Sequence, residues 1–265
     1  METKEMPGEV FMTTQFDLFA DAYEQSLTAL PFRKQVEVPS FLETIGDVTG
    51  LSVLDLGCGS GVYTRILRQK GAALTVGADI SEGMLDYARR REARERLGVS
   101  YILQDAMIVA TEPDEVLANS FDLVVSVYML PYADSNKRLT AVCTNARNAL
   151  RSPGQRFVAF VMNPDFSGEP SWYRHYGFEL LDKNTIRKEG SSIRLKASVG
   201  DHRVDVEAYY WSRTAHERAL REAGFGEIRW IKPWLSADGR AGQNEAYWSN
   251  YLSCPHALLI EAVAA

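Results

Sequence analysis

An acidic residue followed by three alternating glycines is the part of this sequence best suited to binding chemistry. Asp55 is followed by Gly57, Gly59 and Gly61; apolar residues precede the acid and a helical pattern follows the last glycine. This order predicts a strand that ends in a glycine-rich turn and opens a helix, the nucleotide-binding corner of an α/β fold. The glycines allow the backbone to approach a ligand where a Cβ would clash.

Two cofactor classes compete for such a corner. A dinucleotide fingerprint needs its third small residue three positions after the second glycine, Gly59, where this chain has Val62. The carboxylate of Asp55 would also repel a pyrophosphate and suits a ligand that carries a positive amine. Both features favour S-adenosylmethionine (SAM) over NAD. The spacing D-x-G-x-G-x-G resembles motif I of the class I SAM-dependent methyltransferases.

Alternating strand and helix signals predict the elements that position this turn. Strands are expected at 51–56, 73–78, 101–103, 121–127 and 156–162, with helices at 60–70, 81–97 and 139–150. Such alternation predicts an α/β fold with a doubly wound, mostly parallel sheet. The resemblance implies a Rossmann-like sheet of seven strands in the order 3-2-1-4-5-7-6, the last strand antiparallel, with helices on both faces.

The pattern changes after residue 162. Two alternating segments, 193–199 and 203–209, flank Gly200-Asp201 and predict an inserted β-hairpin. A helix is expected at 214–223, and strands at 226–231 and 256–263 form an edge hairpin joined by 232–255. We therefore divide the chain into an N-terminal helical lid over the cofactor (1–40), a SAM-binding core (41–162), a substrate-pocket insertion with an aromatic acceptor lid (163–211) and the C-terminal part of the core (212–265).

Several further residues fall where the resemblance places cofactor contacts. Asp79 ends the second strand and can accept hydrogen bonds from both ribose hydroxyls, or it is an ordinary acid at a helix entry. Asp105 is expected to bind the adenine amino group or to cap the next helix. The expected cofactor set is Tyr23, Arg33, Asp55, Gly57, Cys58, Gly59, Gly61, Asp79, Ile80, Met84, Gln104, Asp105, Ala106, Ser126 and Val127.

The roles in this set differ. Ile80 and Met84 would pack on adenine, although Met84 is also an ordinary core residue type. The carbonyls of Ser126 and Val127 would face the methionyl ammonium. Tyr23 would close over the cofactor, or its helix packs on the sheet. The guanidinium of Arg33 would reach the methionyl carboxylate, and Cys58 is a small residue tolerated in the turn or a reactive thiol.

The acceptor side is predicted from aromatic residues, because all five tryptophans follow residue 163. Large flat side chains without strong core periodicity suit a pocket for a planar or apolar molecule, although most aromatics simply pack. Candidate bases are His175 and, more weakly, Tyr128, Tyr132 or His202. The expected substrate residues are Tyr128, Tyr132, Trp172, His175, Tyr176, Tyr209, Trp211 and Trp248.

Composition restricts the partners. The 265 residues carry a net charge of −6, which disfavours nucleic acid as a partner. We find no apolar run long enough for a membrane span, no signal peptide and no metal-ligand spacing, and the three cysteines are scattered. We therefore expect a cytoplasmic monomer or homodimer that binds a small-molecule acceptor, without membrane or metal.

Short aromatic segments refine the expected function. Those at 172–178, 209–212 and 245–248 resemble bacterial natural-product enzymes of the toxoflavin N-methyltransferase kind. The resemblance implies methyl transfer from SAM to a nitrogen, or less favourably a carbon or oxygen, of a small planar or apolar secondary metabolite, leaving S-adenosylhomocysteine. The alternative is a protein of the same fold that binds or cyclises a small molecule without methyl transfer. An RNA substrate is disfavoured because 126–132 lacks an Asn/Asp-Pro-Pro-aromatic motif.

Overall fold

The main sheet of this computed structural model has seven strands, and the structure describes residues 16, 19–109, 117–182, 187–242 and 245–265. The strand order is β3-β2-β1-β4-β5-β10-β9. The first five strands run parallel, whereas β10 is antiparallel to both β5 and β9. Their bounds are β1 Ser52–Leu56, β2 Leu74–Asp79, β3 Ser100–Leu103, β4 Leu123–Val127, β5 Arg156–Met162, β9 Phe225–Ile231 and β10 Ala257–Ala264. The expected strand order and the antiparallel last strand are confirmed.

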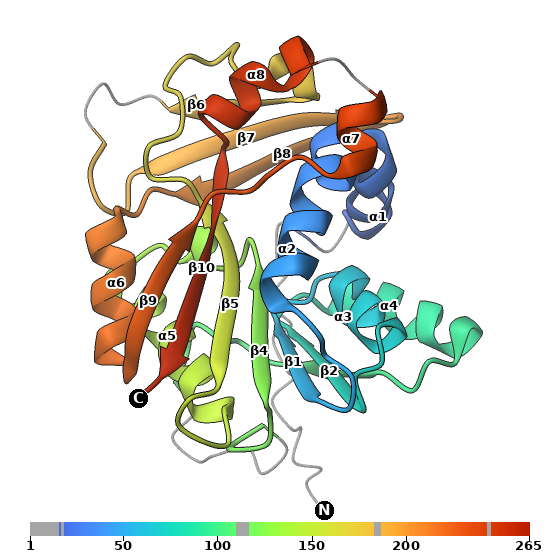
Figure 1. The fold of residues 1–265 in the computed structure, drawn as a ribbon, viewed down its shortest axis with the longest axis vertical. Coiled ribbons are helices and arrows are strands. Elements are labelled where there is room, and N and C mark those ends of the chain that lie inside the picture. Colours follow the sequence, from blue (N-terminus) through green and yellow to red (C-terminus); the bar gives the residue numbers. More distant parts are fainter. Residues whose placement is uncertain (1–15, 17–18, 110–116, 183–186, 243–244) are drawn as a thin grey trace, which may run out of the picture.

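The central strands are apolar at successive positions because both faces of the sheet are covered. In β4, Val124 belongs to a core with helices α5 and α6, whereas Leu123 and Val125 belong to a core with α2 and α3. The same division separates Leu54 from Val53 in β1. A helix layer therefore covers each face, as Figure 1 shows.

The helices begin and end near their sequence signals. Ser81, Ser135 and Ser212 each cap a helix by accepting a hydrogen bond from the backbone N–H three residues later. Helix α1 is followed by a π-helical turn, Arg33–Glu37, that continues into α2. The bounds are α1 Ala20–Ala29, α2 Val38–Ile45, α3 Val62–Gln69, α4 Glu82–Glu95, α5 Asn136–Ala149, α6 Arg213–Glu222, α7 Ala237–Gly242 and α8 Glu245–Ser253; three-residue 3₁₀ turns are Leu130–Tyr132 and Arg174–Tyr176.

A second, antiparallel sheet is inserted after β5. It has the order β6-β7-β8, with bounds Phe178–Asp182, Ser192–Val199 and His202–Tyr209. The hairpin β7–β8 matches the predicted one, while β6, α7 and α8 were not foreseen. Figure 1 shows this sheet lying across the carboxyl ends of the parallel strands, with α1 and α7 beside it. The insertion therefore covers the edge where ligands bind in open α/β folds.

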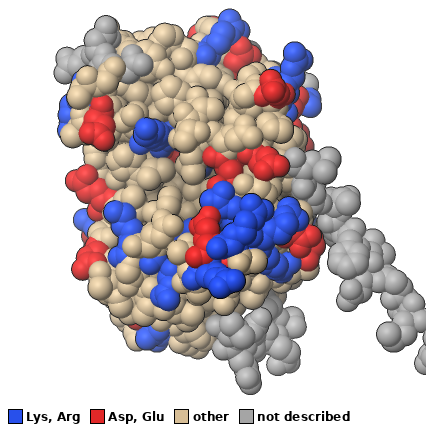
Figure 2. All heavy atoms as spheres, turned by 90° about the vertical axis from the view of Figure 1, so that its right-hand side faces the viewer, with Lys and Arg blue, Asp and Glu red and all other residues tan. Residues whose placement is uncertain are grey.

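The surface on the side of α3 and α4 carries a group of basic side chains, visible in Figure 2. Helix α4 contributes an arginine run in which Arg89 pairs with Glu82 and Asp86, and Arg91 pairs with Glu95. The Arg89–Asp86 and Arg91–Glu95 pairs have the spacings of three and four residues that bring side chains together on a solvated helix face. Within the described parts of the chain, no helix is both long and apolar enough to cross a membrane.

Candidate active site

The glycine-rich turn after β1 holds its backbone close to two neighbouring strands. Gly57 donates its N–H to the carbonyl of Ala78 at 2.8 Å, and Gly59 donates to Asp79 Oδ2 at 2.7 Å. Gly57 has a φ of 75°, and a Cβ there would lie 2.7 Å from Cβ of Met129. Glycine is thus required at Gly57 by conformation and by space.

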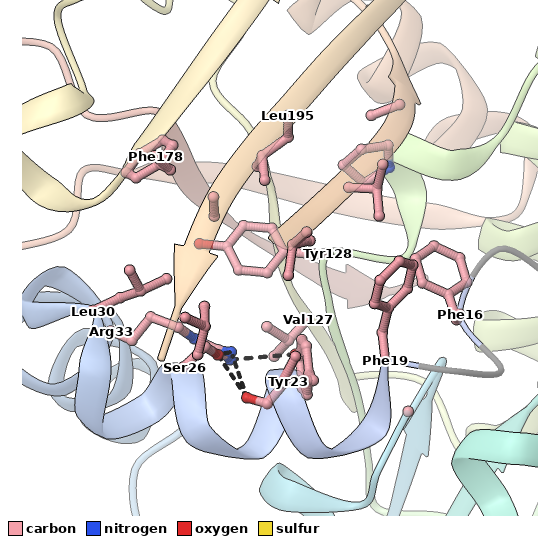
Figure 3. Close-up of a pocket in the computed structure, with 18 of the residues that line it drawn as sticks. Phe16, Phe19, Tyr23, Ser26, Leu30, Arg33, Val127, Tyr128, Phe178 and Leu195 are labelled. Carbon is pink, nitrogen blue, oxygen red and sulfur yellow. Dashed lines mark hydrogen bonds between the residues drawn. The ribbon is translucent and has the colours of Figure 1, made fainter. Parts of the chain in front are cut away.

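A cavity of about 200 Å³ opens above this turn, at the carboxyl ends of β1 and β4. We call its lower lining, Gly57, Gly59, Met84 and Val127, the floor. Alternate residues of the hairpin β7–β8 form what we call the roof: Leu195, Ala197, Val199, Val204, Val206 and Ala208. Helix α1 closes one side, and Figure 3 shows Phe19 and Tyr23 projecting from it toward the cavity.

A buried ion pair lines the same cavity. Arg33 Nε donates to Glu37 Oε1 at 3.0 Å, and their side chains are only 5% and 1% exposed. Arg33 also donates to Ser26 Oγ at 2.5 Å and to the hydroxyl of Tyr23 at 3.3 Å (Figure 3). Because a buried charge is costly without partners, this pairing fixes the geometry of both side chains. Arg33 lies at the site, as expected, and its contact with a methionyl carboxylate stays a prediction.

Tyr128 connects this ion pair to a histidine. Its hydroxyl lies 2.7 Å from Glu37 Oε2 and 3.1 Å from His256 Nε2, while His256 Nδ1 lies 3.0 Å from the hydroxyl of Tyr251. The backbone of Tyr128 has a φ of 63°, an uncommon conformation for a non-glycine residue that often marks a functional site. Burial and Glu37 raise the pKa of Tyr128 well above its usual value, so the phenol keeps its proton.

His256 is buried and neutral. Burial, assisted by the positive charge of Arg33, lowers the pKa of its imidazole to about 3. The rings of Phe32, Phe178 and Tyr173 pack around it. Sequence reasoning missed both His256 and Glu37, because each is isolated in the sequence and no local spacing connects them.

Asp55 lies beneath the floor and outside the cavity lining. Its carboxyl accepts a hydrogen bond from Thr64 Oγ1 at 2.7 Å, and burial raises its pKa from 3.8 to about 7, with a smaller contribution from Asp79. Asp79 accepts backbone hydrogen bonds from Gly59 and from Ser81. These contacts hold the turn against β2, and ligand contacts by Asp55 and Asp79 remain predictions.

The remaining expected cofactor residues surround the turn. Ser126 Oγ donates to the carbonyl of Leu56 at 2.8 Å, and burial raises the pKa of Cys58, which disfavours a reactive thiol. Asp105 accepts from the N–H of Met107, and the carbonyl of Ala106 accepts from Asn145. Gln104 Oε1 is buried and has no hydrogen-bond partner among the residues that the structure describes. Gly61 and Ile80 adjoin the turn without lining the cavity.

Six of the eight expected acceptor residues lie outside the lining of this cavity, which corrects their placement; aromatic rings that do line it include Phe19, Phe32 and Phe178. Tyr128 and Tyr132 do line the cavity. Tyr176 and Trp248 instead stack with ring centroids 5.8 Å apart in a third core, which Trp172 packs against and which shares Phe32 and Phe178 with the cavity lining. The exposed His175 packs on Tyr247, His202 is an exposed residue at the start of β8, and Tyr209 and Trp211 pack against the core around α5 and α6.

The physical reason for this correction is that large aromatic side chains are stabilised most by burying their surface in a packed core. The insertion does face the cavity, but apart from Phe178 of β6 it does so with the aliphatic side chains of β7 and β8. No group of His, Cys, Asp and Glu side chains arranged to hold a metal occurs within the described ranges.

Residues 53–154 match the family model described as a methyltransferase domain. A ubiquinone biosynthesis O-methyltransferase from Coxiella burnetii is 29% identical over 147 residues, covering 55% of this chain and 58% of that protein. The chain thus spans just over half the length of the curated relatives it matches. Residues 53–154 are thus similar to a methyltransferase domain, and the strand order of the sheet is the one expected from the sequence.

Solved structures share the fold over almost the whole chain. An S-adenosylmethionine-dependent methyltransferase from Mesorhizobium loti has a TM-score of 0.60 at 21% identity, covering 89% of this chain and 99% of that one. Magnesium protoporphyrin IX methyltransferase from Synechocystis, solved with bound S-adenosylhomocysteine, has a TM-score of 0.52 at 18% identity, covering 99% of this chain and 90% of that one. These similarities confirm the predicted fold class.

Proposed function

We propose that this protein transfers a methyl group from SAM to a small, largely apolar acceptor. The observation that carries the proposal is the position of the cavity. It lies directly above the glycine-rich turn and beneath an apolar roof, so one space reaches both the expected donor site and a pocket for an acceptor. In-line displacement needs little more than this alignment and the exclusion of water.

The residues present fit SAM. A Cβ at Gly59 would have no neighbour nearer than Met84 Sδ at 4.0 Å, so the turn faces open space that a cofactor can fill. Gln104 Oε1, beside the expected adenine contact Asp105, is a buried acceptor without a partner in the described chain. When bound, SAM supplies an electrophilic methyl group on a positively charged sulfur. Tyr23, Arg33, Asp79 and the floor would hold it.

The roof determines the class of acceptor. Its aliphatic surface suits an apolar small molecule. The aromatic sequence segments favour a nitrogen acceptor in secondary metabolism, whereas the curated relatives are named O-methyltransferases in ubiquinone biosynthesis. We propose a small metabolite as acceptor.

Ligand binding and turnover test this proposal against a non-methylating protein of the same fold. Calorimetry should show that wild-type protein binds S-adenosylhomocysteine and does not bind NAD or ATP. Asp79→Asn should weaken that binding roughly tenfold, because it removes a charged hydrogen-bond acceptor from the ribose site. Asp86→Asn on the outer face of α4 is the matched control.

Release of S-adenosylhomocysteine from SAM with added acceptors completes the test. Turnover supports a methyltransferase, whereas tight cofactor binding without turnover across an acceptor panel supports the alternative of ligand binding or cyclisation. Tight NAD binding without binding of the sulfonium compound or its product contradicts both.

A further inference from the structure

We infer that Tyr128 passes the acceptor's proton to Glu37 and that the acceptor therefore reacts through a hydroxyl group. This inference rests on the proposed function and adds the reacting atom and the proton route. Tyr128, Glu37 and His256 all line the cavity, and Glu37 is the one carboxylate in its described lining. We call the hydrogen-bonded chain Tyr251–His256–Tyr128–Glu37 the relay.

The direction of each hydrogen bond in the relay follows from counting protons. Glu37 is ionised beside Arg33 and can only accept, so the single hydroxyl proton of Tyr128 points to Glu37. His256 Nε2 must then carry the proton that it shares with Tyr128. His256 Nδ1 consequently accepts from Tyr251. Every donor in the relay points toward Glu37.

This direction identifies the base. His256 has no free lone pair, because Nδ1 accepts from Tyr251 and Nε2 donates to Tyr128, so it orients the phenol and takes no proton from the acceptor. Tyr128 retains one lone pair on its hydroxyl oxygen, through which it can accept a proton from a bound hydroxyl while giving its own to Glu37. Glu37 is therefore the terminal base, and Tyr128 is the group that touches the acceptor.

The proton and electron balance closes without another reactant. The acceptor oxygen forms a bond to the methyl carbon, the bond from that carbon to sulfur breaks with its electron pair left on sulfur, and the hydroxyl proton ends on Glu37. As the new bond forms, the oxygen becomes strongly acidic, so a carboxylate is a sufficient base. Once the product leaves, the same route returns the proton to water in the cavity.

An amine acceptor would not need this arrangement, because a neutral amine already has a nucleophilic lone pair. The chain nevertheless holds a buried carboxylate, two phenols and an imidazole in one series of hydrogen bonds beside a mainly apolar cavity. Tyr128 adopts its uncommon backbone conformation at the centre of this set. Figure 3 shows its ring lying between β7 and α1.

The chain offers a matched pair of variants. Tyr63 also donates its hydroxyl to Glu37, at Oε1, but Tyr63 is absent from the described lining of the cavity. Tyr128→Phe and Tyr63→Phe therefore each remove one phenol from the same carboxylate, and only the first removes a group that can reach the acceptor. His256→Gln is a third variant that loosens the orientation of Tyr128 while keeping its hydroxyl.

Three probe acceptors distinguish a relay from a structural role: para-ethylphenol, para-nitrophenol at a pH where it is ionised, and para-ethylaniline. Tyr128→Phe should lower kcat for para-ethylphenol about 100-fold or more, with KM and the Kd of S-adenosylhomocysteine nearly unchanged. It should change turnover of the nitrophenolate and the aniline less than about threefold, since neither needs a base. Tyr63→Phe should stay within about tenfold on all three, and His256→Gln should lower kcat for para-ethylphenol alone.

The outcomes separate the two proposals. Wild-type protein that fails to bind S-adenosylhomocysteine contradicts the proposed function itself. Wild-type protein that binds it but methylates only the aniline, or none of the three probes, overturns the hydroxyl assignment. Equal losses from Tyr128→Phe and Tyr63→Phe, or a loss from Tyr128→Phe that is the same for phenol and nitrophenolate, overturn the relay.

Discussion

The floor of the cavity comes from residues close together in sequence, whereas its roof and the relay come from segments far apart. The floor centres on one turn, in which Gly57 and Gly59 donate hydrogen bonds to the end of the neighbouring strand β2. The roof is an insertion after β5, and the relay joins residues near the two ends of the chain. The sequence therefore indicates the expected cofactor site much more clearly than the acceptor of the proposed methyl transfer.

The largest expected effect that tests this contrast concerns Asp55, whose carboxyl lies beneath the floor. Burial raises the pKa of Asp55 from 3.8 to about 7, so between these values the folded protein binds more protons at this site than the unfolded chain does. This contribution favours the folded state at low pH and is lost as the pH rises through 7, by up to about 4 kcal/mol.

Asn cannot ionise, so Asp55→Asn should gain roughly 2.5 kcal/mol in the free energy of unfolding relative to wild type between about pH 5 and about pH 8. Urea denaturation at both pH values measures it, with Asp86→Asn as a surface control. A difference that does not change with pH would show that the carboxyl of Asp55 is not desolvated as the structure indicates.

The second test concerns the shape of the floor. Ala at Gly57 would place Cβ 2.7 Å from Met129 in a left-handed backbone conformation, so the turn must move. Gly57→Ala should weaken binding of S-adenosylhomocysteine about 100-fold, which calorimetry can measure. Gly46→Ala is the control: its φ is 74°, but no neighbour lies within 4 Å, so only the backbone cost remains. Equal effects at both positions would argue against a cofactor at this turn.

The smallest expected effect concerns the roof. Ala197 faces the cavity from β7, and Ala197→Leu would fill space intended for the acceptor. We expect KM for the acceptor to rise about tenfold, while the Kd of S-adenosylhomocysteine stays unchanged. Ser198 is exposed on the opposite face of the same strand, so Ser198→Leu supplies the control. A parallel loss of cofactor affinity in Ala197→Leu would show that floor and roof are not separate sites.

The sequence predicted the fold well because its signals are local. The alternation of strands and helices, the turn at Gly57–Gly61 and the hairpin around Gly200 each depend on neighbouring residues. The acceptor side was misread because Trp248 and Tyr176 have the same residue types whether they face a ligand or each other. Glu37 and His256 could not be found because only the three-dimensional fold brings them to Tyr128.

The positions joined by Tyr128 also bear on how the protein is made. Its hydroxyl meets one partner 91 positions earlier in the chain and another 128 positions later. During synthesis, the glycine-rich turn can fold before much of the later polypeptide has been made, because its contacts are local. The proton route closes only when the final strand has emerged and inserted between β5 and β9. A nascent chain can thus form the glycine-rich turn well before Tyr128 meets both of its hydrogen-bond partners.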